Sequence, residues 1–62
     1  MEILRDNTEA GVPFLIVAAA DAADAEIFAT ENAVEYNPYF EGMETGTAQE
    51  TSIEGTFKVP FG

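Results

Sequence analysis

Cysteine and histidine are absent from the sequence, and Arg5 and Lys58 are its only cations. A chain without cysteine cannot form a disulfide, and without either residue type the usual zinc sites are excluded. The commonest general base and the thiol nucleophile are missing as well. A chain of 62 residues can hardly build a substrate cleft, so we expect neither enzymatic activity nor a cofactor.

Long apolar runs are also missing. The longest, Val12–Ala20, has nine residues and is interrupted by Pro13, whereas a membrane-spanning helix needs about 20 apolar residues. The residues from Met1 to Gly11 lack the basic region and long apolar core of a signal peptide. We therefore expect a soluble protein that stays in the compartment where it is made and does not enter a membrane.

Negative charge dominates the composition, with twelve acidic residues and a formal net charge of −10. Residues 6–57 carry eleven of the acids and no cation. This balance argues against direct binding to nucleic acid or to an anionic membrane, both of which attract Lys and Arg. At 47% hydrophobic residues the chain is nevertheless too apolar for ordinary disorder. We expect a small fold that repels itself and gains stability from a partner.

Both ends of the sequence carry β-type signals. Met1–Gly11 begins with an apolar pair and turns polar, which predicts an arm or an edge strand. Val12–Ala18 is a short apolar run rich in β-branched residues, which predicts a buried strand. Thr51–Val59 alternates, and this predicts a strand that Pro60 ends. One face of that strand would hold Ile53, Gly55, Phe57 and Val59.

The remaining short segments connect these elements. Glu44–Gln49 contains a glycine and small polar residues, so it is predicted to be a linker or an exposed turn. Residues 60–62 form a short apolar tail.

Residues Ala19–Tyr36 allow two structures. As a helix, they place Ala20, Ala23, Ile27 and Val34 on one apolar face. As a hairpin, Glu26–Ala29 and Ala33–Tyr36 would be strands around a turn at residues 30–32. The alanine content favours the helix, with Asp21 or Asp24 as N-cap. Asn37 and Pro38 end either structure.

These elements predict one small α+β domain over residues 1–62, in which 1–11 could form the arm. It would have a buried N-terminal strand, one acidic alanine-rich helix and a C-terminal strand. A small all-β fold is the alternative if residues 19–36 form the hairpin.

Four acidic residues fall on a second face of the predicted helix, next to the apolar one. They are Asp21, Asp24, Glu31 and Glu35. Such a face could meet a basic protein surface, or imitate DNA phosphates in a nucleic-acid-binding cleft. Asp21, Asp24 and Glu26 could also bind calcium through oxygen ligands, although a solvated surface is favoured because the spacing of an EF-hand loop is missing.

Aromatic and apolar residues near the middle and end of the chain are candidate anchors for a partner protein. They are Tyr36, Tyr39, Phe40, Met43 and Phe61. The first four could instead cap the domain's own core. Phe61 follows Pro60 near the end of the sequence, and we expect it to dock into a neighbouring subunit.

One stretch, ETSIEGTFKVP from Glu50 to Pro60, resembles the closing strand of small cement or decoration proteins of tailed-bacteriophage capsids. The resemblance spans eleven of the 62 residues. It is carried by Glu50, Ile53, Gly55, Phe57, Val59 and Pro60. It implies a β element used for packing and attachment to a capsid lattice, and no catalytic residue. Those proteins are usually longer, with earlier glycine-bearing strands that have no counterpart here.

Two functions follow as expectations. The first is a non-enzymatic structural protein, a virion cement or accessory capsid subunit that is made in the host cytoplasm and stabilises a larger protein assembly. It could also form homo-oligomers. The alternative is a cytoplasmic acidic inhibitor that mimics nucleic acid and binds a DNA- or RNA-binding protein.

Overall fold

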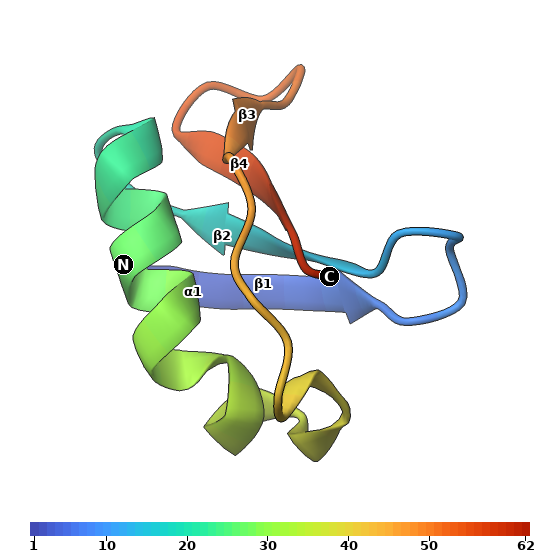
Figure 1. The fold of residues 1–62 in the computed structure, drawn as a ribbon. Coiled ribbons are helices and arrows are strands. Elements are labelled where there is room, and N and C mark those ends of the chain that lie inside the picture. Colours follow the sequence, from blue (N-terminus) through green and yellow to red (C-terminus); the bar gives the residue numbers. More distant parts are fainter.

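The computed structural model describes residues 1–62 and shows a two-layer α+β domain, as predicted (Figure 1). The layers are an antiparallel sheet with strand order β1-β2-β4-β3 and one helix on one of its faces. The elements are β1 (Glu2–Asn7), β2 (Phe14–Ala18), α1 (Ala22–Tyr36), a 3-10 helix η1 (Pro38–Phe40), β3 (Gln49–Glu50) and β4 (Thr56–Pro60).

Residues 22–36 form the helix and not the hairpin. Asp21 is the N-cap, and one of its carboxylate oxygens accepts a hydrogen bond from the backbone N–H of Asp24 at 2.8 Å. Such a bond satisfies one of the free N–H groups at a helix start. The helix ends at Tyr36, since Asn37 precedes a proline and has extended backbone angles. The sequence therefore predicts the C-terminal end of α1 correctly, whereas the helix begins three residues after Ala19, behind the first of the two candidate N-caps.

The predicted inner face of the helix is wrong. Ala25, Ala29 and Ala33 are buried against the sheet, whereas Ile27 and Val34 are 58% and 44% exposed. The three alanines are four residues apart and so lie on one face. Small side chains let the helix axis approach the sheet closely, which leaves the larger apolar residues on the outer side.

The N-terminal residues form an edge strand and not an arm, because β1 pairs with β2 along its length. The register shifts between Ile3 and Arg5, where a β-bulge leaves Leu4 without a partner. The strand predicted over Val12–Ala18 is confirmed as β2, between β1 and β4. Its residues Leu15 and Val17 are fully buried under α1.

The strand predicted over Thr51–Val59 is half wrong. Residues 51–55 form the turn of the β3–β4 hairpin, and β4 begins only at Thr56. Gly55 has φ +81°, a conformation that favours glycine and interrupts the alternation. Ile53 is consequently 68% exposed, while Phe57 and Val59 face the core as predicted.

The C-terminal tail is held by the segment predicted to be a linker. The N–H of Glu44 donates to the carbonyl of Gly62 at 2.7 Å, and the N–H of Gly62 donates back to the carbonyl of Glu44 at 3.0 Å. The N–H of Gly46 donates to the carbonyl of Pro60, and Thr45 and Phe61 form an isolated β-bridge. Residues 44–46 and 60–62 therefore continue the antiparallel pairing of β3 with β4 to the last residue. The prediction that Pro60 ends the strand is wrong, because Pro60 lies within β4 and its carbonyl accepts a hydrogen bond.

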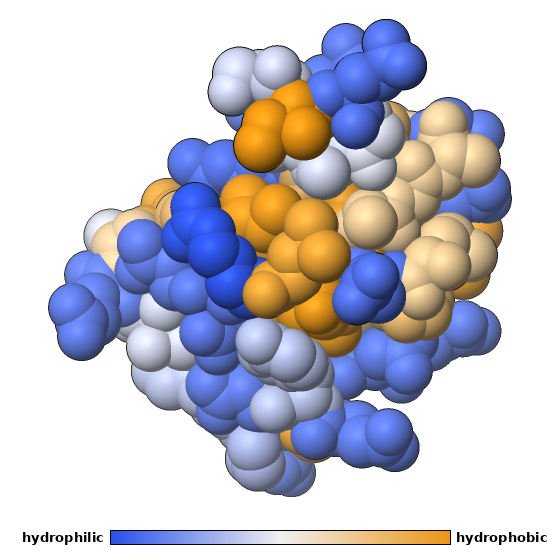
Figure 2. Space-filling view, turned by 180° about the vertical axis from the view of Figure 1, so that it is seen from behind, coloured by the Kyte–Doolittle hydropathy of each residue, from blue (hydrophilic) through white to orange (hydrophobic).

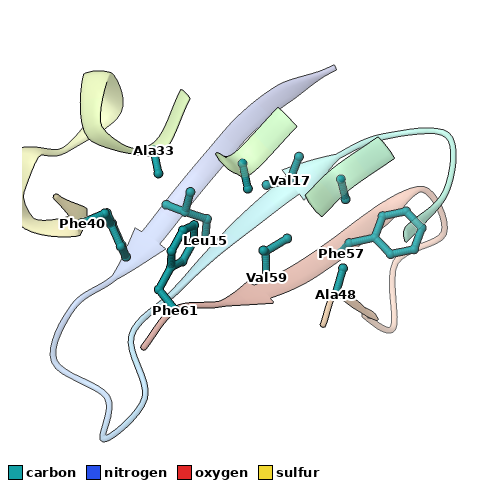
Figure 3. Packing of buried hydrophobic residues seen from close by; sticks show 10 residues of the cluster. Leu15, Val17, Ala33, Phe40, Ala48, Phe57, Val59 and Phe61 are labelled. Carbon is teal, nitrogen blue, oxygen red and sulfur yellow. The ribbon is translucent and has the colours of Figure 1, made fainter. Parts of the chain in front are cut away.

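The core lies between α1, the sheet and this fastened tail (Figure 3). Leu15, Val17 and Val59 rise from the sheet toward the alanines of the helix. At one end Phe40 and Phe61 pack with ring centroids 4.8 Å apart, next to Leu15 (Figure 3). The aromatic side chains fill the space that the short alanines leave open.

The alanine face gives the first testable prediction. Ala29→Leu adds three carbons at a position with no exposed surface. Overpacking should lower the free energy of unfolding by about 1–3 kcal/mol, measured by urea denaturation with circular dichroism. The matched control Ala23→Leu, on the exposed side of the same helix, should change it by less than about 0.5 kcal/mol. Equal losses would contradict packing through the alanine face.

Candidate protein-binding surfaces

Two of the five predicted anchors lie on the surface. Tyr36, the last residue of α1, is 46% exposed, and Tyr39 in η1 is 48% exposed. The Tyr39 ring meets the Phe40 ring edge-on at a centroid distance of 5.5 Å, so one side of Tyr39 rests on the core while the other is open. The backbone here is set by Asn37, whose side-chain oxygen accepts a hydrogen bond from the N–H of Tyr39 at 3.0 Å. Both tyrosines are thus held in place at the end of the helix.

Phe40 and Phe61 are wrong as partner anchors. They are 1% and 3% exposed and belong to the domain's own core. Phe61 is drawn inward because its N–H donates to the carbonyl of Pro13 at 2.9 Å and its neighbours pair with residues 44–46. Met43 is partly buried and packs against the same core. The sequence could not reveal these contacts, which join segments far apart in the chain.

The predicted acidic face exists as a stripe along α1. Glu31 and Glu35 are exposed, and Asp24 is half-buried on the same side of the helix. Asp21 is occupied as the N-cap. Glu26 lies off this stripe, and its carboxylate accepts a hydrogen bond from the N–H of Ala48 at 2.8 Å. No group of three acidic side chains is placed to hold a metal ion.

The sheet face opposite the helix carries both cations, which sequence reasoning missed. Arg5 and Lys58 are both in register with Ile16, so the three residues form a row across β1, β2 and β4. Their charged ends lie 5.9 and 4.5 Å from the ring centre of Phe14, within the range of cation–π attraction. The sequence did contain one indication of this position: in the alternating pattern of β4, Lys58 lies between two buried residues and so points to the face away from the core.

Apolar surface gathers in the middle of the side of the molecule seen in Figure 2 and continues toward the right, while hydrophilic side chains dominate on the left and below. Leu4 is 46% exposed and Ile16 is half-buried on this open sheet face. The two cations here offset only two of the twelve acidic charges of the chain, whereas a phosphate backbone is attracted by an excess of positive charge. The absence of direct nucleic-acid binding stays a prediction from the charge balance.

A groove of about 230 Å³ lies between β1 and the second half of α1. Its apolar lining is Met1, Ile3, Phe28 and Tyr36, and its polar lining is Glu2, Asn32 and Glu35. At the far end of β1 the side-chain amide of Asn37 donates to the carboxylate of Asp6 at 2.8 Å. This bond ties the end of the helix to the end of the strand and fixes the separation of the two elements.

Comparison with protein-family models, curated proteins and solved structures found no match. None of the helices in the structure has the length and apolar character that crossing a membrane requires.

The burial of Phe61 gives a second prediction. Phe61→Ala should lower the free energy of unfolding by about 3–5 kcal/mol, because it leaves a cavity beside Phe40. Tyr39→Ala, which removes an exposed ring and one edge contact, should cost about 1 kcal/mol. Thermal and urea unfolding measure both. If Phe61→Ala does not fold, Phe61→Leu can be compared with Tyr39→Ala instead. A loss of unfolding free energy for Phe61→Leu no larger than that for Tyr39→Ala would contradict the position of Phe61 in the core.

Proposed function

We propose that this chain is a non-enzymatic interaction protein that binds a larger protein assembly as an accessory subunit, in the manner of a capsid cement protein. The observation that carries the proposal is the half-exposed pair Tyr36 and Tyr39 beside a core that is complete without them. Tyrosine is enriched at protein interfaces because it offers a rigid apolar ring with a polar end. Such residues frequently contribute most of the binding energy.

The surroundings of the tyrosines support a partner with a basic surface. Glu31 and Glu35 are exposed on the helix before them, and Glu41 is exposed directly after η1. Both cations of the chain lie on the opposite side, on the open sheet face. This separation gives the tyrosine side a uniformly negative field, which would steer a positively charged partner toward it.

Mimicry of nucleic acid remains the second candidate, and the acidic stripe on α1 is the observation that favours it. Asp24, Glu31 and Glu35 place three carboxylates along about 16 Å of helix. Duplex DNA carries a negative charge about every 1.7 Å along its axis, so the stripe is several-fold sparser. We therefore rank mimicry below attachment to a protein assembly.

Sedimentation tests the proposed function. In extracts of the native host, the tagged chain should co-sediment with large protein particles and remain with them after nuclease treatment. The variant Tyr36→Ser/Tyr39→Ser should lower the bound fraction about ten-fold or more, as loss of interface anchors does, while circular dichroism shows its fold intact.

The matched control is Val12→Ser/Ile53→Ser, which removes two apolar side chains that are 58% and 68% exposed in hairpin turns. It should stay with the particles. Wild-type chain found free at the top of the gradient would contradict the proposal. Recovery with a nucleic-acid-binding protein, through an interaction that weakens steeply as the salt concentration rises, would favour the mimic.

A further inference from the structure

The outer edge of β1 is free to pair with another strand. β1 is the edge strand with six residues, whereas the opposite edge strand, β3, has only two. Apart from the sheet ladder with β2, no backbone or side-chain hydrogen bond reaches the backbone of residues 2–7. In an edge strand, alternate N–H and C=O groups point away from the sheet and can accept a new strand.

The groove beside this edge is placed to receive side chains of an added strand. Ile3 pairs with the buried Val17 and therefore points to the helix side of the sheet, where Phe28 packs against the same core. The lower half of α1 extends beyond the β1 edge in Figure 1, and the groove lies between them. Every second side chain of a strand laid along β1 would point toward α1 and enter the groove.

The size of the groove fits side chains better than a cofactor. Its volume of about 230 Å³ lies below the range of roughly 300–1,000 Å³ typical of small-molecule sites. The hydrogen bond from Asn37 to Asp6 holds helix and strand together, so the groove exists before any ligand arrives.

The charge of the groove selects its occupant. Glu2 and Glu35 line it, Asp24 lies on the same side of α1, and no cation is among the lining residues. Arg5, the cation nearest in sequence, is in register with Ile16 on the other face of the sheet and contacts Phe14. An extended segment whose groove-facing side chains, every second one along the strand, include both apolar residues and Lys or Arg would complement the apolar lining together with Glu2 and Glu35.

We propose that β1 and the adjoining groove bind an extended, basic and apolar peptide segment of a partner protein by strand addition. The inference rests on the proposed function, because the segment would belong to the assembly that this chain joins. Backbone hydrogen bonds to β1 supply the binding energy. The apolar side chains of Ile3 and Phe28 and the acidic side chains that line the groove determine which peptide sequences bind.

The probe is a capped peptide of the repeat Val-Thr-Lys-Thr, in which valine and lysine share one face of the strand, titrated into isotope-labelled protein at low salt. Backbone amides of β1 and the side-chain amide of Asn32 should shift in the NMR spectrum, and β1 amides should gain protection from hydrogen exchange. Methylating the backbone nitrogens that face β1 should abolish binding, whereas methylating the alternate set should not, because only one edge of the peptide pairs with β1.

Charge variants provide the matched comparison. Glu2→Gln/Glu35→Gln should weaken binding about five- to ten-fold, since it removes the acidic side chains that line the groove. Glu50→Gln/Glu54→Gln makes the same change in net charge on the exposed β3–β4 hairpin and should weaken binding less than about two-fold through the long-range field alone.

Several results would overturn the inference: no binding at millimolar peptide, equal binding by both methylated peptides, or shifts confined to the open sheet face. Pairing of β1 with β1 of a second copy, seen as concentration-dependent shifts without peptide, would also overturn it. The tyrosine experiment remains separate. If Tyr39→Ser alone still releases the chain from its particles while the peptide fails to bind, the accessory-subunit proposal stands and only the strand-addition site is refuted.

Discussion

Close packing of the alanine face of α1 on the sheet decides how the rest of the surface is arranged. Ala25, Ala29 and Ala33 must face Leu15, Val17 and Val59 for the core to close. Once the helix is rotated in this way, every other position on it is fixed by the helical period. Ile27 and Val34 point outward, Glu31 and Glu35 form the exposed stripe, and Phe28 and Asn32 turn toward β1. The tyrosine end and the groove are both consequences of that rotation.

The short alanine side chains also leave space at one end of the core, and aromatic residues from the C-terminal part of the chain fill it. Phe40 from η1 and Phe61 from the tail pack against each other at the end of the core. Phe61 reaches that place because residues 44–46 pair with residues 60–62. The chain has no disulfide and a net charge of −10, yet the structure closes its core without residues from a partner. Binding in the proposed function therefore uses the surface of a finished domain and does not complete its interior.

The charged residues divide between the two sides of the domain in a way that suits attachment. Arg5 and Lys58 flank Phe14 on the open sheet face, and the acids of α1 lie on the helix side. A partner with a basic surface would meet the helix side, where the tyrosines and the groove also lie. An unpaired edge strand is a hazard for a small protein because it invites aggregation. The bulge at Leu4 and the charges along β1 limit unspecific pairing of this edge. A partner strand of complementary charge would still pair with it.

Features that depend on neighbouring residues could be predicted from the amino-acid order alone. Asp21 caps the helix, Asn37 and Pro38 end it, and the apolar run around Leu15 forms a buried strand. These follow from local hydrogen bonding, backbone restriction and side-chain shape, so the α+β class could be predicted. Tyr36 and Tyr39 are exposed, and their role as anchors stays a prediction. Three features instead required the folded domain: which helix face is inside, where Phe61 goes, and that β1 borders a groove. Hydropathy favoured Ile27 and Val34 as the inner residues, but the separation of helix and sheet favours alanine, and no local pattern encodes that separation. The turn at Gly55 and the pairing of Thr45 with Phe61 join segments whose contacts the sequence pattern does not reveal. The physical reason is that packing and long-range pairing minimise the free energy of the whole domain, and they override the preferences of single segments.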